Sequence, residues 1–444
     1  MTTHPLPHVP VAIVGGGPGG LVAARVLHIH GVRADVFERE ASPGARTQGG
    51  MLDIHEDSGQ KALRAAGLHD AFSRIVHPGG QAMRLVGPDG TVHVSEEDDG
   101  TGGRPEVDRG ALRDLLLGSL PEGTVHWGRK VTGVRPLGGG RHEVAFADGS
   151  AVTTDLLIGA DGAWSRVRPL VSDAEPAYTG VSFVETDLHD ADARHPREAA
   201  LVGGGFFLCL GGGAPGGEAL GGERLGEGRF DEGRGFLAHR ETDGSLHVYT
   251  ALRADEGWLD TVDFTDADTG AAKAAVLAHF EGWDDALRGL VADADGPLVP
   301  RRIHALPVGH RWDRVPGVTL LGDAAHLMSP FAGEGANLAM LDGAELALAV
   351  VSRPGDVEAA LDAYEKELFP RGEASAADSA ESLDVMFGER ALERTVEFFT
   401  SDPAARTSGP AARTSDPAAR TSGPAARGGR ACPTAGPASP GRAR

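Results

Sequence analysis

The stretch HVPVAIVGGGPGGLVAARVLHIHG, residues 8–31, decides the fold. Its first half is a short apolar run typical of a buried β-strand, and its second half repeats apolar side chains at helical spacing. Between the two halves, Gly15, Gly17, Pro18 and Gly20 form a G-x-G-x-x-G turn. Glycine lets a phosphate group approach backbone N–H groups at the positive end of the helix. The stretch therefore predicts a dinucleotide-binding strand–turn–helix unit.

An acid at the end of the next expected strand supports this interpretation. Glu38 stands 23 residues after Gly15, in VRADVFERE, where a carboxylate can accept hydrogen bonds from ribose hydroxyls. We assign Glu38 and the adjacent Arg39 to cofactor binding. The alternative, a tight turn that binds nothing, requires neither the helix nor the acid.

A second glycine-rich stretch shows how little the motif means alone. Residues 211–216 also fit G-x-G-x-x-G, but the residues after them are too rich in glycine to form a helix. We interpret them as part of a loop that spans residues 203–235. The sequence thus predicts one nucleotide-binding Rossmann unit and not two.

The stretch GDAAHLMSPFAGEGAN, residues 322–337, predicts a second binding element. Asp323 follows an apolar strand, Pro330 turns the chain, and Gly333 and Gly335 allow a flat ligand to come close to the backbone. A helix begins near residue 335, and its positive N-terminus would stabilise the negative charge of a reduced flavin. This stretch suits the ring half of a flavin cofactor.

A third element, LLIGADGAWSRVR at residues 156–168, ends a strand at Asp161. On its own it is equally consistent with a structural turn.

Together, the three motifs resemble those of the single-component FAD-dependent aromatic hydroxylases, which have the para-hydroxybenzoate hydroxylase fold. Within that family, residues 49–68, 105–120, 124–130 and 322–333 are similar to segments of the tetracycline-inactivating monooxygenases. The resemblance covers roughly residues 9 to 395 and implies an α/β fold, with a Rossmann-type FAD-binding domain interleaved with a mainly antiparallel substrate domain.

The resemblance also implies roles for individual residues. Arg46 would contact NADPH, and Asp53, Arg109 and Asp323 would contact FAD, as would Asn337 of the last motif. His247 and Glu185 would contact the substrate. The alternatives without a binding role are that Arg46 is a solvated surface arginine and that His247 is a core histidine hydrogen-bonded within the protein. Three departures from the family pattern are Ser329, Glu334 and the run 336–338.

The expected domain boundaries follow from changes in the sequence pattern. The FAD-binding domain takes residues 1–75, 100–172 and 300–352, and the substrate domain takes 76–99 and 173–299. C-terminal helices occupy 353–399. From residue 400 the repeats TSDPAAR and TSGPAAR bury almost nothing, so we expect a disordered tail over 400–444, with a binding arm as the alternative.

Composition narrows the class of protein. The 444 residues carry a net charge of −22, which argues against nucleic acid or an anionic membrane as a partner. The two cysteines, far apart, indicate no disulfide framework and no metal site. With no signal-peptide pattern and no apolar run near 20 residues, we expect a soluble, cytoplasmic protein, and a monomer.

These observations favour a monooxygenase that uses FAD, NADPH and O₂ to hydroxylate a tetracycline-like or other polycyclic aromatic polyketide. The flavin carries the chemistry, so we assign no catalytic base. One alternative is a biosynthetic polyketide or phenol hydroxylase of the same fold. A flavin halogenase is a second alternative, but this sequence lacks the WxWxIP segment of those enzymes. The alternative from another functional class is a flavin-binding sensor without turnover.

Overall fold

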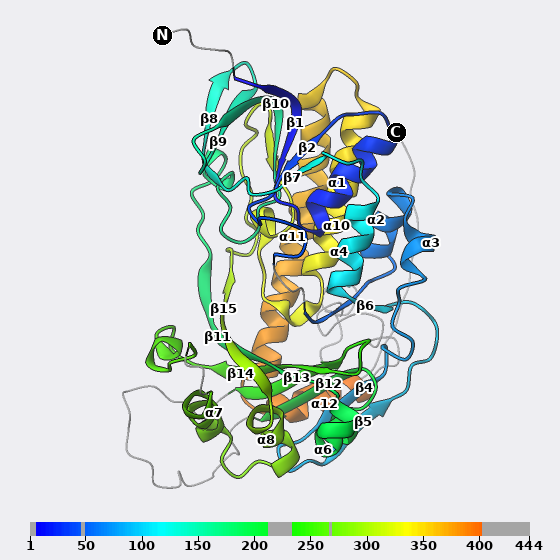
Figure 1. Ribbon diagram of the computed structural model, residues 1–444, viewed down its shortest axis with the longest axis vertical. Coiled ribbons are helices and arrows are strands. Elements are labelled where there is room, and N and C mark those ends of the chain that lie inside the picture. The colour runs from blue at the N-terminus through cyan, green and yellow to red at the C-terminus, as the bar shows by residue number, and fades with distance from the viewer. Residues whose placement is uncertain (1–5, 46–48, 212–232, 266–268, 402–444) are drawn as a thin grey trace, which may run out of the picture.

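The structure, a computed structural model, describes residues 6–45, 49–211, 233–265 and 269–401. Figure 1 shows two lobes, with β1, β10 and α1 in the upper one and β11, β13 and β14 reaching into the lower one. The molecule is an α/β protein in which two seven-stranded sheets face a shared cavity. A two-stranded sheet lies between the lobes and joins β3 (Met51–Asp53) to β6 (Glu106–Asp108).

The sheet of the upper lobe is built around β1 and β10. These two strands run parallel, with Val11 opposite Leu156, and β10 also pairs in parallel with β16. Residues 11–14 of β1 are all buried, as expected for a parallel strand covered on both faces. The strands are β7 (Val125–His126), β2 (Asp35–Phe37), β1 (His8–Val14), β10 (Ala151–Gly159), β9 (Arg141–Phe146), β8 (Val131–Gly138) and β16 (Val318–Leu320).

Helices α1 and α10 pack against each other beside this sheet. A Cβ on Gly343 would lie 2.2 Å from the carbonyl oxygen of Gly19, so only glycine permits this close approach. The contact brings two motifs that are three hundred residues apart in sequence to one place. The helices of this lobe are α1 (Pro18–Ile29), α2 (Gly59–Ala65), α3 (His69–Phe72), α4 (Arg109–Gly118), α9 (Asp323–His326) and α10 (Gly335–Ser352).

Helix α10 is long and apolar enough to meet a length-and-composition test for a membrane span. However, half of it is buried, and it packs against α1, α2 and α11 (Val357–Phe387). These contacts identify it as a core helix.

The sheet of the lower lobe is mainly antiparallel, and its two faces differ. Alternate residues of each strand point to opposite faces, so Val184 packs under α6 to α8 while Phe183 faces the cavity side. The strands in order are β15 (Asp295–Ala305), β11 (Ala177–Leu188), β14 (Leu246–Arg253), β13 (Arg234–Arg240), β12 (Phe206–Gly211), β4 (Met83–Val86) and β5 (Val92–Glu96). The helices here are α5 (Ala191–Arg194), α6 (Pro196–Val202), α7 (Gly270–Leu277) and α8 (Asp285–Ala292).

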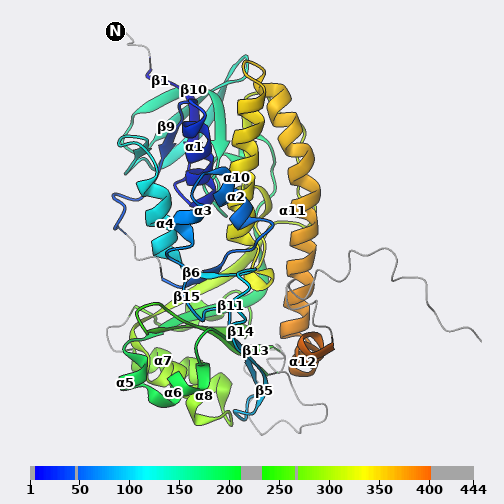
Figure 2. The same cartoon turned by 90° about the vertical axis from the view of Figure 1, so that its right-hand side faces the viewer.

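Helix α11 connects the two lobes (Figure 2). It runs for 31 residues through Pro370, within the range 353–399 where the sequence predicts C-terminal helices. Proline removes one helical N–H, but burial of Leu368 and Ala376 on either side holds the helix together. The last helix, α12 (Ala391–Ser401), packs against β12 and β5.

Side chains and turns close some of these elements. The carboxylate of Asp108 caps α4 by accepting from the N–H of Ala111, and the hairpin at residues 148–149 joins β9 to β10. Ser58 stands at the N-cap of α2, but its hydroxyl makes no capping bond.

Three predicted boundaries differ in the structure. The expected loop over 203–235 contains β12 and the start of β13, since the apolar run at 206–210 completes the second sheet. Residues 212–232 lie outside the described part. Strand β15 crosses the expected boundary at residue 300, because its pairing with β11 continues to Ala305. Helix α12 extends to Ser401, and the repeats over 402–444 lie outside the described residues.

Candidate active site

A cavity of about 2290 Å³ lies between the lobes. Ordinary small-molecule sites occupy roughly 300–1,000 Å³, so this space can hold a dinucleotide and a second molecule. Most of the residues predicted from sequence line it: Gly15, Gly17, Pro18, Gly20, Glu38, Arg39, Asp53, Arg109, Asp161, Glu185, Asp323, Pro330, Gly333 and Gly335. Arg46 lies outside the described residues, and neither Asn337 nor His247 is part of the wall.

The N-terminus of α1 forms one end of the cavity. Gly17 is its N-cap and makes no side-chain capping bond, and a Cβ placed on Gly17 would meet nothing within 4 Å. The helix therefore presents free N–H groups and open space to the cavity, as a pyrophosphate requires.

Glu38 lies beside this helix end, as the sequence predicts. Its Oε2 accepts from the N–H of Gly16 at 2.7 Å, and its Oε1 accepts from the N–H of Glu40 at 2.9 Å. Each carboxylate oxygen can accept a second hydrogen bond, so Glu38 keeps capacity for ribose hydroxyls. Arg39 lines the same end with an exposed side chain.

The N-terminus of α10 also opens on the cavity. Its N-cap, Glu334, makes no capping bond, and a Cβ on Gly335 would meet nothing within 4 Å. The one-turn helix over residues 330–332 and Gly333, at φ +68°, bring the chain to this helix end. Two uncapped helix N-termini thus face one space, which suits an anionic ligand with two charged parts.

Asp323 points into the same space, and its side chain is exposed there. Surrounding protein raises the pKa of Asp323 by desolvation, while His326, Arg109 and Arg168 oppose that rise. The backbone at Asp323 is held by Arg168, whose guanidinium donates to the carbonyls of Asp323 and Ala324 at the start of α9.

Asp161, assigned from the sequence to cofactor binding, lines the cavity and also organises its own turn. Its Oδ1 accepts from the hydroxyl of Ser165 at 2.6 Å, and its Oδ2 accepts from the N–H of Arg166 at 2.6 Å. Burial raises the pKa of Asp161 against these bonds. A contact of Asp161 with the cofactor stays a prediction.

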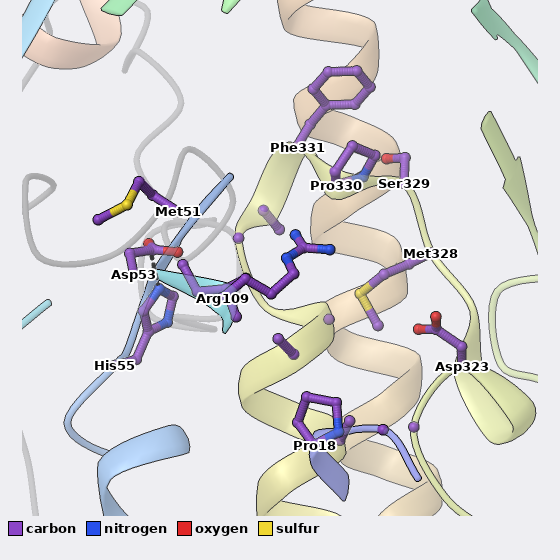
Figure 3. Close-up of a pocket in the computed structure, with 18 of the residues that line it drawn as sticks. Pro18, Met51, Asp53, His55, Arg109, Asp323, Met328, Ser329, Pro330 and Phe331 are labelled. Carbon is purple, nitrogen blue, oxygen red and sulfur yellow. Dashed lines mark hydrogen bonds and ion pairs between the residues drawn. The ribbon is translucent and has the colours of Figure 1, made fainter. Parts of the chain in front are cut away.

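Arg109 crosses the centre of the site (Figure 3), between Asp53 and His55 on one side and Asp323 and Met328 on the other. It is the first residue of α4, and its exposed guanidinium lines the cavity. This position allows Arg109 to neutralise a negative ligand group.

Asn337 stands behind the cavity wall and is 1% exposed. Its Nδ2 donates to the carbonyls of Asp53 and Gly333, and its Oδ1 accepts from the N–H of His55. Since these bonds use its donors and an acceptor, Asn337 positions two segments of the wall and does not point into the cavity.

His55 was not identified from the sequence, although it lies two residues after Asp53. Its Nε2 lies 2.7 Å from Oδ2 of Asp53, and its Nδ1 lies 2.8 Å from Oε1 of Glu334. Burial alone would lower the pKa of His55, but the two carboxylates outweigh burial and raise it to about 9. At neutral pH His55 is therefore an imidazolium held between two acids.

The two predicted substrate residues are both paired with protein groups. Glu185 lines the cavity and binds Arg301, with Nε 3.0 Å from Oε1. His247 lies behind Gly50, and its Nδ1 is 2.6 Å from Oδ1 of Asp187. A direct contact of His247 with the substrate stays a prediction.

Comparison with known proteins identifies the family to which this chain belongs. A family model described as "FAD binding domain" matches residues 8–202 and 286–379. Monooxygenase asqM of Emericella nidulans is 30% identical over 433 residues, which cover 86% of this chain and 96% of that protein. The chain belongs to the FAD-dependent monooxygenases.

Solved structures agree with this monooxygenase in fold. HpxO of Klebsiella pneumoniae, complexed with FAD and uric acid, is 24% identical with a TM-score of 0.69, over 90% of this chain and 93% of HpxO. The tetracycline destructase Tet(55) is 18% identical with a TM-score of 0.66, over 90% of this chain and 97% of Tet(55).

The residues present in this monooxygenase fit FAD. The open space at Gly17 and Gly335 is the kind of cradle that a Cβ would fill, and each position begins an uncapped helix. Glu38 would hold the ribose, the α1 N-terminus the pyrophosphate, and Asp323 a hydroxyl of the ribityl chain. Among the described residues, no group of His, Cys, Asp and Glu could hold a metal ion.

Proposed function

We propose that this monooxygenase hydroxylates a neutral, polycyclic aromatic or polyketide-like molecule of the tetracycline type, with NADPH as reductant. The observation that carries the proposal is the shape and lining of the cavity beyond the flavin end. There the second sheet contributes aromatic and apolar side chains: Phe183, Phe206, Leu208, Leu237 and Tyr249. Phe331, Met386 and Phe399 face them from the other side.

Bound FAD would supply the reduction of O₂ and the transfer of one oxygen atom to an electron-rich carbon. The chain's own residues bind, orient and exclude water. The α10 N-terminus and Arg109 would stabilise negative charge at the flavin end. The aromatic wall would hold the flat substrate against that end, away from bulk water.

NADPH is proposed because the family resemblance implies it, with Arg46 as its contact. The sequence contains one Rossmann unit, which FAD would occupy, so the nicotinamide cofactor would have no Rossmann unit of its own.

The test is the mass of tetracycline after incubation with the purified protein, FAD, NADPH and air. We expect a gain of one oxygen atom that depends on NADPH. A yellow, FAD-loaded protein that leaves tetracycline unchanged would instead favour the second candidate, a biosynthetic hydroxylase of another polyketide or phenol. The identity of 30% to Monooxygenase asqM over nearly its full length keeps that candidate open.

A further inference from the structure

Glu106 is a buried acid that no step above uses. It lies on β6 directly opposite Asp53 of β3, lines the cavity, and is 6% exposed. Its Oε2 is buried and has no hydrogen-bond partner among the described residues. An unpartnered buried polar atom destabilises a fold, so such an atom in a cavity wall points to a missing ligand group.

His239 faces Glu106 from the other lobe. It lies on β13, on the same face as Leu237, and its ring packs at a tilt against Phe206 with centroids 4.8 Å apart. The Nδ1 of His239 is 4.0 Å from Oε2 of Glu106. This separation is too long for a direct hydrogen bond and leaves room for an atom that bonds to both.

Burial opposes a charge on both groups. Burial holds the pKa of Glu106 well above its usual range, Asp53 raises it further, and His55 and Arg104 oppose the rise. Burial lowers the pKa of His239 to about 4, against the attraction of Asp53 and with help from His247 and Arg109. Both shifts favour the uncharged forms, a carboxylic acid and a neutral imidazole, over an ion pair.

We propose that Glu106 and His239 form a subsite for one neutral hydroxyl group of the substrate. The acid donates its O–H to the hydroxyl oxygen, and the hydroxyl donates its own proton to Nδ1 of His239. A hydroxyl is both donor and acceptor, so it satisfies both groups at once. An ether can only accept, and a carboxylate would add negative charge beside Asp53. The class of ligand is thus an alcohol, enol or phenol on a flat apolar body, bound at the lower-lobe end of the cavity.

This inference rests on the proposed function only in taking an aromatic molecule as the ligand. Its first test needs no substrate. In the FAD-loaded protein at neutral pH, we expect the infrared difference spectrum between wild type and Glu106→Gln to contain the C=O stretch of a protonated carboxyl. A carboxylate band in its place would overturn the subsite.

The second test measures binding of two probes, 2-naphthol and 2-methoxynaphthalene, to the FAD-loaded protein by calorimetry. In wild type we expect 2-naphthol to bind about ten-fold more tightly, the effect of one or two good hydrogen bonds. His239→Leu should remove most of that preference and leave the ether unchanged, because only the hydroxyl can donate to His239. Glu106→Met should weaken the binding of both probes, because the O–H of Glu106 donates to either oxygen. Glu106→Gln, which keeps an N–H donor, should weaken both probes less than Glu106→Met does.

Glu97→Met is the matched control, because Glu97 is an exposed acid of the same cavity wall. It should keep the wild-type affinity for both probes. Equal binding of the two probes in wild type, a ratio unchanged by His239→Leu, or affinities for both probes unchanged by Glu106→Met would refute the subsite. Since neither test involves turnover, a failure here is separate from a failure to oxygenate tetracycline.

Discussion

The carboxylate of Glu334 lies 2.8 Å from Nδ1 of His55 and ties the N-terminus of α10 to the segment after β3. The family resemblance marks Glu334 as a departure from the usual glutamine. Its negative charge gives His55 a second anionic partner beside Asp53, and the result is a buried imidazolium in the wall of the flavin site.

Replacing Glu334 by glutamine should lower the pKa of His55 from about 9 towards its ordinary value, because one of two anionic partners is lost. The measurement is an NMR titration of the His55 ring. Glu367→Gln on the exposed side of α11 is the control and should change nothing. An unaltered His55 titration in Glu334→Gln would show that Asp53 alone sets the charge.

The raised pKa of His55 also predicts how the stability of the fold depends on pH. Because the folded pKa of His55, about 9, exceeds the unfolded value, its contribution is fully present below about pH 6.5 and is lost as pH rises towards 9. A pKa rise of that size corresponds to on the order of 3 kcal/mol in the free energy of unfolding. Thermal unfolding from pH 6 to 9.5 should show wild type losing its advantage over His55→Gln. Parallel curves for the two proteins would contradict the assignment.

Asp323→Ala should reduce the FAD content of the purified protein, because a carboxylate aimed into the cofactor space loses its hydroxyl contact. Hydrogen bonds to charged groups are strong enough to weaken FAD binding roughly ten- to hundred-fold. Absorbance of bound flavin after dialysis measures this. Asp313→Ala, an exposed acid outside the cavity, should stay fully loaded. Full flavin occupancy in Asp323→Ala would remove Asp323 from the site.

Arg168→Met should destabilise the fold as well as the site. The guanidinium is 3% exposed and donates to the carbonyls of Ala163, Asp323 and Ala324, which the variant would leave unpaired. We expect a loss of roughly 2–5 kcal/mol in the free energy of unfolding. Denaturant unfolding measures the loss, with Arg353→Met on an exposed turn as control. A loss below about 1 kcal/mol would mean that water replaces these bonds.

Arg46→Ala should leave FAD bound but raise the NADPH concentration needed for half-maximal flavin reduction. The reason is the loss of a guanidinium that the family resemblance assigns to the reductant. Stopped-flow reduction under anaerobic conditions measures it. A requirement identical to wild type would count against Arg46 as the NADPH contact.

Much of this protein follows from sequence because the decisive features are local. A strand followed by G-x-G-x-x-G and a helix fixes the backbone at Gly15 to Gly20, and Glu38 falls beside it through ordinary strand geometry. The late motif at Asp323 to Gly335 is similarly local, so the sequence predicted the flavin half of the site and the α/β class.

Other features were decided only when distant segments met. The continuous α11 survives Pro370 through burial against both lobes, which outweighs a local propensity. Asn337 and Asp161 proved to bond the protein's own backbone, and no sequence pattern reveals which partners an amide or carboxylate will find.

The sequence analysis did not identify three residues of the cavity wall, His55, Glu106 and His239. None of them belongs to a recognisable motif in its own segment. A possible signal for His239 was its spacing of two from Leu237 on an alternating strand. Their protonation depends on burial and on charges brought from other strands. The sequence thus determined what the cavity binds at its flavin end, and only the tertiary structure determined the burial and hydrogen-bonding capacity of the side chains at its other end.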